Sequence, residues 1–172
     1  MKRLLLAVLV LAMGFISYGQ ESEDTNPYEA NNEIKGNGLF LVIGAFDVTY
    51  EYLLNEESGL GLNVFIPYDS EIRDDIQYYV SPYYRFYFGN KYAAGFFLEG
   101  FGMLSSFEPE LFGNDEDYVT DFALGIGLGG KWVTKGGFVG EVSFGFGRNL
   151  LNTDESDIDF VAKLGITLGY RF

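Results

Sequence analysis

The side chains with the chemistry to bind ions or move protons are charged residues spread along almost the whole chain. Each lies where polar and apolar residues alternate, and alternation places every second side chain on one face of a strand. Charges buried on such a face need partners, so we expect a mutually paired, structural network. A narrow, gated ion path is the alternative. The network comprises Glu33, Lys35, Asp47, Glu51, Arg85, Glu99, Asp121, Lys131, Glu141, Lys163 and Arg171.

One pair in this set can be assigned from the sequence. Lys131 and Glu141 flank a predicted hairpin turn at 134–136. Folding that turn places the two residues opposite each other on the same face, where opposite charges stabilise a strand pair. We therefore expect an ion pair between them.

Two absent residue types exclude most catalytic and metal-binding chemistry. The sequence contains no Cys and no His. This rules out disulfides, Ser–His and Cys–His catalytic pairs, and thiolate or imidazole metal sites. Hydroxyl residues such as Ser105 have no His partner, and a carboxylate pair such as Glu99 and Asp121 is the remaining base chemistry. We expect no catalytic residue, no metal and no cofactor, and predict that the protein is not an enzyme.

The segment 125–130 spells the glycine pattern G-x-G-x-x-G of dinucleotide-binding proteins. That motif functions only where a strand turns into the N-terminus of a helix. Here the glycines lie within an alternating stretch with no helical pattern after it. We interpret them as small residues on the inner face of a strand.

The alternation is clearest in the final stretch, 157–172. Its outer set is apolar or aromatic at every second position from Ile158 to Phe172, and the residues between are mostly charged, small or polar. Similar stretches cover 33–43, 46–54, 59–68, 75–88, 91–107, 118–133 and 137–148. Two of these stretches fit less well. The stretch 33–43 loses alternation after Asn37, and in 91–107 Phe97 and Phe101 share a face with Glu99. Eight such stretches predict an all-β, eight-stranded antiparallel transmembrane β-barrel.

The connections support this topology. Those at 55–58, 89–90 and 134–136 are short, whereas those at 69–74, 108–117 and 149–156 are longer. Outer-membrane barrels have short periplasmic turns and longer extracellular loops, with both termini in the periplasm. Only the first extracellular turn, at 44–45, is shorter than expected.

Aromatic residues gather near both predicted barrel edges, as amphipathic rings do at the two membrane interfaces. A soluble barrel of the lipocalin kind has the reverse polarity, with apolar residues inside, so we favour the membrane. The periplasmic girdle comprises Tyr52, Phe88, Tyr92, Trp132, Phe138, Tyr170 and Phe172, and the outer girdle Phe46, Tyr68, Tyr78, Tyr118 and Phe160.

The first residues form a targeting segment. Lys2 and Arg3 precede an apolar run from Leu4 to Ile16, and a small-x-small cleavage site ends at Gly19. This predicts a cleaved signal peptide over 1–19. A flexible acidic leader over 20–32 follows, and the outer-membrane barrel takes up 33–172. No later apolar stretch is long enough for a spanning helix, so insertion requires strands.

Three short segments resemble a known family: 32–35 (NEIK), 48–53 (VTYEYL) and 83–89 (YYRFYFG). They are similar to a bacterial family of small exported proteins in the outer-membrane β-barrel superfamily, for which no reaction or ligand is established. The resemblance implies a barrel of OmpA/OmpX-like size. The end of the chain resembles the signal read by the barrel-assembly machinery, carried by Leu164, Ile166, Leu168, Tyr170 and Phe172.

We expect a non-enzymatic outer-membrane barrel with a structural or surface-interaction role. The alternatives are a narrow ion or small-solute channel and, less favoured, a lipid-directed barrel enzyme. Expected partners are outer-membrane lipids, the assembly machinery and an extracellular partner reached through acidic loops; a formal charge of -14 argues against nucleic acid. The loop acids are Asp69, Glu71, Asp74, Asp75, Glu108, Glu110, Asp115, Glu116, Asp117, Asp154, Glu155 and Asp157. Their spacing is not that of an EF-hand.

Overall fold

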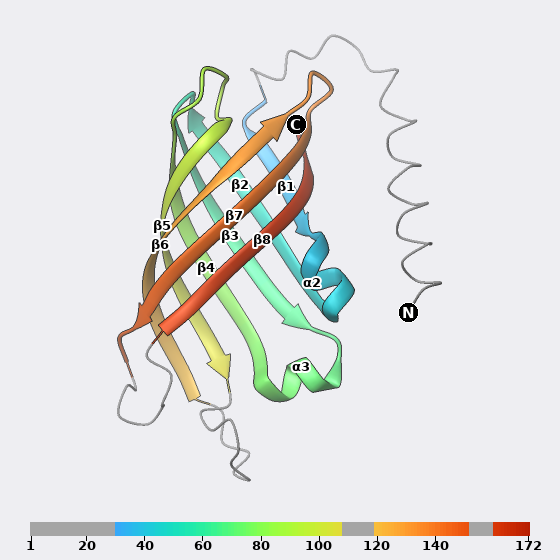
Figure 1. The fold of residues 1–172 in the computed structure, drawn as a ribbon, viewed down its shortest axis with the longest axis vertical. Helices are drawn as coiled ribbons and strands as arrows, with labels where there is room; N and C mark the ends of the chain where they lie inside the picture. Colours follow the sequence, from blue (N-terminus) through green and yellow to red (C-terminus); the bar gives the residue numbers. More distant parts are fainter. Residues whose placement is uncertain (1–29, 108–118, 152–159) are drawn as a thin grey trace.

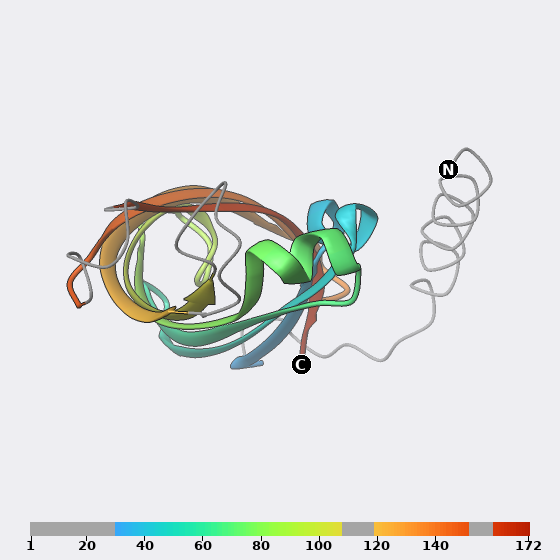
Figure 2. The ribbon, with the colours of Figure 1, turned by 90° about the horizontal axis from the view of Figure 1, so that it is seen from below.

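The protein is a closed antiparallel barrel in a computed structural model that describes residues 30–107, 119–151 and 160–172. Each strand pairs with its neighbours in sequence, and β1 pairs with β8 to close the ring, as Figures 1 and 2 show. The strands are β1 (Asn32–Asn37), β2 (Ala45–Asn55), β3 (Ser58–Pro67), β4 (Ile76–Tyr87), β5 (Gly95–Phe107), β6 (Val119–Val133), β7 (Phe138–Asn149) and β8 (Phe160–Arg171). The predicted eight-stranded barrel is confirmed. The predicted signal peptide, and the leader up to residue 29, lie outside the described residues.

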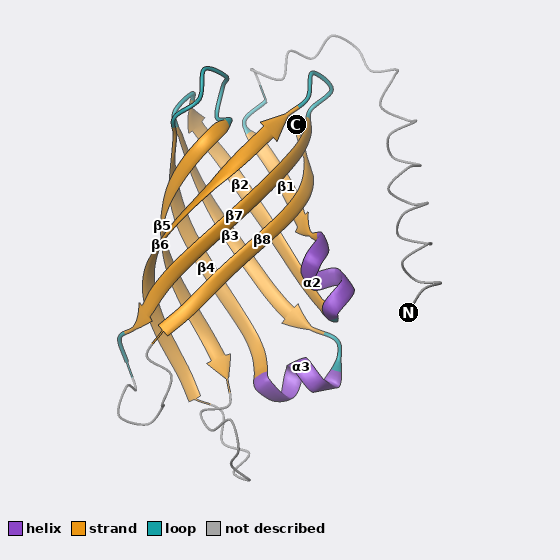
Figure 3. Cartoon of the chain, in the orientation of Figure 1, coloured by secondary structure: helices purple, strands orange, loops and turns teal. Residues whose placement is uncertain are grey.

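The two ends of the barrel differ. At the end where β1 begins and β8 finishes, hereafter the turn end, short turns join β2 to β3, β4 to β5 and β6 to β7. The opposite end, hereafter the loop end, carries two short helices, α2 (Gly38–Ile43) and α3 (Ser70–Asp75) (Figure 3). Neither helix is long and apolar enough to cross a membrane, and the same holds for the whole described part of the chain.

Side-chain parity determines the two faces of the wall. In β8, Leu164, Ile166 and Leu168 are each about half exposed, whereas Thr167 and Arg171 are buried. Exposed apolar side chains of this kind lie on the outer face of all eight strands. A continuous apolar exterior is stable in hydrocarbon and unstable in water. The fold is therefore a membrane β-barrel, with its polar face inside.

Most girdle residues project outward as predicted, including Tyr52, Phe88, Trp132 and Tyr170. Tyr92 is the exception. Residues 91–94 form a turn, so strand parity does not apply, and Tyr92 packs against the lumenal residues of the turn end. The outer girdle is exposed at Phe46, Tyr68, Tyr78 and Phe160, and Tyr118 lies outside the described residues.

The predicted strand over 33–43 is wrong beyond Asn37. The chain forms β1 and then turns into α2, because Asn37 caps the helix: its Oδ1 accepts from the Leu39 N–H at 3.2 Å. The helix ends at Gly44, whose φ of 128° is a conformation that favours glycine. The loss of alternation in the sequence was therefore a change of secondary structure.

Two further boundaries differ from the prediction. The loop expected at 69–74 contains α3, with Asp69 as its N-cap and strand β4 starting at Ile76. The strand expected from residue 91 begins at Gly95, after a turn in which Ala93 has φ 40°. In both places a helical or turn conformation delays the start of the strand relative to its polarity pattern.

The short β1 leaves a seam in the wall toward the loop end. Pairing of β1 with β8 stops at Asn37↔Thr167, so β8 from Phe160 to Ile166 has no partner in β1. An unpaired strand edge is costly within a membrane. Helix α2 packs against both β2 and β8 at this point, and the Asn37 side chain donates to Leu164 O at 3.1 Å while accepting from Ile166 N at 3.4 Å.

We predict that Asn37→Ala lowers the free energy of unfolding by about 1–3 kcal/mol, because it removes the helix cap and leaves buried edge groups unsatisfied. Urea unfolding in lipid vesicles, followed by the fluorescence of Trp132, the single tryptophan, measures the change. Asn55→Ala is the matched control: its side chain accepts from Glu57 N in an exposed turn, so we expect a loss of under about 0.5 kcal/mol. Equal effects in the two variants would contradict the assigned role of Asn37.

Candidate functional site

The candidate site is the barrel interior, which is organised in layers. An apolar cluster lies near the loop end and includes Phe65, Tyr79, Phe101 and Met103. A smaller apolar cluster of Leu53, Tyr87, Ala93 and Phe97 lies near the turn end. Between them lies a set of ion-paired side chains, hereafter the ion cluster: Glu33, Lys35, Glu51, Arg85, Glu99, Lys131, Glu141, Lys163 and Arg171.

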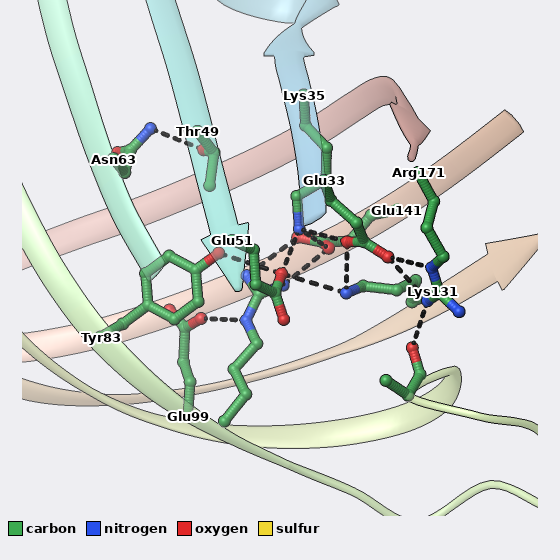
Figure 4. Close-up of polar contacts among 12 residues, drawn as sticks. Glu33, Lys35, Thr49, Glu51, Asn63, Tyr83, Glu99, Lys131, Glu141 and Arg171 are labelled. Carbon is green, nitrogen blue, oxygen red and sulfur yellow. Dashed lines mark hydrogen bonds and ion pairs between the residues drawn. The ribbon is translucent and has the colours of Figure 1, made fainter. Parts of the chain in front are cut away.

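Glu51 lies at the centre of the ion cluster (Figure 4). Its Oε2 is 2.5 Å from Lys35 Nζ, 3.0 Å from Lys131 Nζ and 3.3 Å from Arg85 Nη1. These three cations come from β1, β6 and β4, so one carboxylate joins distant parts of the wall. Glu51 is fully buried, and a buried charge is tolerated only with such compensation.

Arg85 joins two further carboxylates. Its Nη1 and Nη2 donate to the two carboxylate oxygens of Glu141 at 2.7 and 2.9 Å, and its Nε donates to Glu99 at 2.7 Å. The planar guanidinium fits such bidentate contacts, which lysine cannot make. Lys163 completes this side with a contact of 3.1 Å to Glu99.

Glu33 anchors the turn-end side of the ion cluster. It accepts from Arg171 at 2.6 and 2.8 Å and from Lys131 at 2.7 Å. Arg171 also donates to the backbone carbonyls of Tyr92 and Ala93 in the β4–β5 turn. The last strand is thereby linked to the first strand and to this turn.

Lys131 and Glu141 lie opposite each other as predicted, but the predicted ion pair between them is wrong. The two residues are directly opposite in β6 and β7, yet Lys131 bonds to Glu33 and Glu51 across the lumen, and Glu141 bonds to Lys35 and Arg85. In a narrow lumen, charged groups from opposite walls meet at the axis. Lys131 and Glu141 therefore each find their partners across the barrel and not beside them.

Tyrosines that the sequence analysis did not single out complete the ion cluster. The hydroxyls of Tyr83 and Tyr87 donate to Glu51, and Lys131 donates to the Tyr87 hydroxyl. The Arg85 guanidinium lies over two rings, 4.4 Å from the centroid of Tyr83 and 4.1 Å from that of Phe97. In β4, Tyr83 and Tyr87 lie two residues apart from Ser81 or Arg85 and so share their face of the strand. This spacing was the signal that could have placed the two tyrosines inside.

Two buried acids lie apart from the ion cluster. Asp47 accepts from Asn37, Asn63 and Tyr79, and Asp121 accepts from the backbone N–H groups of Phe122 and Leu151. Donors reach both oxygens of Asp47, whereas at Asp121 both donors reach Oδ1, and Oδ2 has no hydrogen-bond partner among the described residues.

The conceivable carboxylate pair of Glu99 and Asp121 is not brought together. Asp121 is opposite Ser105, six residues along β5 from Glu99 and hence about 20 Å away. Within the described residues, no cluster of three or more acids is arranged to hold a metal ion.

The glycine pattern at 125–130 lies entirely within β6. Gly125 and Gly127 lie on the inner face as predicted, but the prediction is wrong for Gly130, which lies on the outer face beside Trp132. A Cβ at Gly125 would meet the ring of Phe101, and one at Gly127 would meet the side chain of Glu99. Glycine is needed here because large side chains of β5 occupy the lumen beside β6. The dinucleotide-binding interpretation has no structural basis.

Comparison with known proteins identifies the fold. No family model matches the sequence, and no curated protein matches it. The N-terminal β-barrel domain of Pseudomonas aeruginosa OprF superposes with a TM-score of 0.61 at 14% identity, covering 83% of this chain and 98% of that one. The outer membrane protein Ail of Yersinia pestis is also similar, with a TM-score of 0.41, 19% identity, and coverage of 84% and 100%. The likeness to OprF confirms the outer-membrane β-barrel fold implied by the sequence resemblance.

We predict that Glu51→Gln destabilises the barrel by about 3–5 kcal/mol, because it leaves Lys35, Lys131 and Arg85 with too little negative charge. Urea unfolding in vesicles measures the loss. Glu57→Gln, in an exposed turn, should change stability by less than about 0.5 kcal/mol.

A second variant checks the cause. Adding Lys131→Met to Glu51→Gln removes one of the uncompensated cations, so stability should recover in part. A double variant no more stable than Glu51→Gln alone would contradict charge imbalance as the reason.

Proposed function

We propose that this protein is a non-enzymatic, non-conducting barrel of the outer membrane, with a structural or surface-interaction role at its loop end. The observation that carries the proposal is the ion cluster. The side chains of Lys35, Glu51, Arg85, Lys131 and Glu141 are between 0 and 3% exposed, and they meet across the lumen. Apolar layers lie on both sides of them.

The energetics of the ion cluster favour a plug over a pore. A conducting lumen needs hydrated, exchangeable charges, whereas these charges are desolvated and bonded to one another. The ion cluster has five cations and four carboxylates, so it offers one uncompensated charge within a contact network. Opening a path would break several buried ion pairs at once.

The outer-membrane location is supported by three features together: the apolar exterior, the predicted signal peptide and the fold. The loop end then faces outward. There, α3 presents the exposed acids Glu71 and Asp74 beside its N-cap Asp69. Asp75 is the last residue of α3. The remaining predicted loop acids, in 108–117 and 154–157, lie outside the described residues. An acidic outer end on a rigid barrel favours contact with a cationic partner or with divalent ions.

Planar-bilayer recording tests the plug. We expect the wild-type barrel to show no conductance steps above those of a protein-free bilayer, and the double variant Arg85→Ala, Glu141→Ala to show steps, because it empties the lumen while preserving charge balance. The control Glu56→Ala, Lys135→Ala removes the same charges from exposed turns and should stay silent. A heat-modifiable band on an unboiled gel checks that each variant is folded.

The opposite outcomes favour the other functions. Wild-type steps that disappear on changing Arg85 or Lys131 would support a narrow channel. Turnover of added phospholipid by the purified barrel, lost on changing a single carboxylate, would support a lipid-directed enzyme.

The absence of cysteine allows a direct test of orientation. A single Asp74→Cys variant places a unique thiol on α3, and Lys135→Cys places one in the β6–β7 turn. We expect a membrane-impermeant maleimide to label the Asp74→Cys variant on intact cells and the Lys135→Cys variant only after the outer membrane is permeabilised. The reverse pattern would overturn the proposed orientation.

A further inference from the structure

The outer wall near the turn end carries a groove of about 820 Å³. It runs over β5, β6 and β7, and the outward-facing side chains of Phe96, Leu128, Trp132 and Phe144 line it. Its volume falls in the range of about 300–1,000 Å³ typical of small-molecule sites. Because it lies on the lipid-facing surface, the molecules that reach it are those of the bilayer.

Gly130 creates the depth of the groove. It has the parity of its outward-facing neighbours in β6, and its register partners Phe96 and Val142 flank it. A Cβ at this position would meet only the ring of Trp132, at 3.5 Å. The missing side chain therefore leaves open space between large apolar groups, shaped for a slender apolar chain.

A cation lies at the rim of this groove. Lys91, in the β4–β5 turn, lines it together with Asn90 and is exposed. Lys91 makes no ion pair with any residue that the structure describes. At this depth of a bilayer, the negatively charged groups are lipid phosphates.

We propose that this groove is a binding site for one phospholipid of the periplasmic leaflet, with an acyl chain over Gly130 and its phosphate at Lys91. The assignment of leaflet rests on the proposed outer-membrane orientation. An anionic lipid such as phosphatidylglycerol is preferred over phosphatidylethanolamine, whose own ammonium competes with Lys91 for the phosphate. This preference for an anionic lipid comes from Lys91 and not from the overall charge, because the protein as a whole is acidic.

Trp132 makes the site directly observable. It is the single tryptophan of the chain, and it lines the groove. Bromine on an acyl chain quenches indole fluorescence only at short range. Brominated phosphatidylglycerol or brominated phosphatidylethanolamine, titrated into vesicles of unbrominated phosphatidylcholine, therefore reports which lipid occupies the groove.

From the quenching of Trp132, we expect the wild-type groove to bind phosphatidylglycerol about fivefold more strongly than phosphatidylethanolamine, the effect of one lysine near a membrane surface. Lys91→Ala should abolish this preference. Lys135→Ala is the matched control, because it removes the same charge from another turn at the same end, outside the groove. Equal binding of the two lipids by the wild type, or equal losses in the two variants, would overturn the proposal.

A second pair of variants tests the acyl-chain position. Gly130→Leu fills the groove and should reduce quenching by both brominated lipids. Gly36→Leu adds the same side chain to the outer face of β1, where a Cβ meets nothing within 4 Å, and should leave quenching unchanged. Unchanged quenching in the Gly130→Leu variant would overturn the assigned position.

The experiment also separates this proposal from the one on which it rests. Quenching of wild-type Trp132 by both lipids without preference leaves the membrane barrel intact and removes the lipid site. No quenching by any brominated lipid, with the protein in the soluble fraction, removes the membrane location itself. No quenching in an inserted barrel that sediments as a dimer assigns the groove to a second copy of the chain and overturns the lipid proposal.

Discussion

Charge compensation inside a narrow lumen is the constraint on which the rest of this structure depends. An eight-stranded barrel is just wide enough for side chains to fill it, so any charge placed inside is desolvated at once. Glu51 is stable there because Lys35, Lys131 and Arg85 surround it and two tyrosine hydroxyls donate to it. These contacts reach strands far apart in sequence. The same interactions therefore fill the barrel and join its walls.

The neighbouring layers are adapted to this ion cluster. Aromatic rings of Tyr83 and Phe97 enclose the Arg85 guanidinium, which limits the access of water to the charges. Glycines of β6 leave room for the large side chains that β5 sends inward. In an interior packed in this way, the volume of each side chain and the positions of the charges depend on each other. A substitution that changes the volume of a lumenal side chain therefore also disturbs the ion pairs, and one that changes a charge disturbs the packing. Such an interior is suited to a rigid support.

The exterior follows a different constraint, the hydrocarbon around it. Backbone groups must be paired within the protein, and outward side chains must be apolar. Toward the loop end, β1 is too short to pair with the backbone groups of β8. Helix α2 and the Asn37 side chain cover this free edge of β8. Near the turn end, Gly130 and Lys91 shape a local exception to the smooth apolar wall.

The sequence by itself determined the strand number, the two faces of the wall and the inward set of charges, because a strand alternates its side chains with a period of two. That rule operates within each strand and needs no knowledge of the rest of the chain. It predicted correctly that Phe97 and Phe101 share the inner face with Glu99.

Only the tertiary structure decided the partners across the lumen. Lys131 is directly opposite Glu141 in the register of β6 and β7, as the sequence predicts. Closure of the ring, however, brings Glu33 and Glu51 to Lys131, and these two are its ion-pair partners. The change from strand to helix at Asn37 and the inward turn of Tyr92 depend on caps and turns, which periodicity does not describe. Local alternation thus predicts which face a residue occupies, while its contacts depend on how the barrel closes.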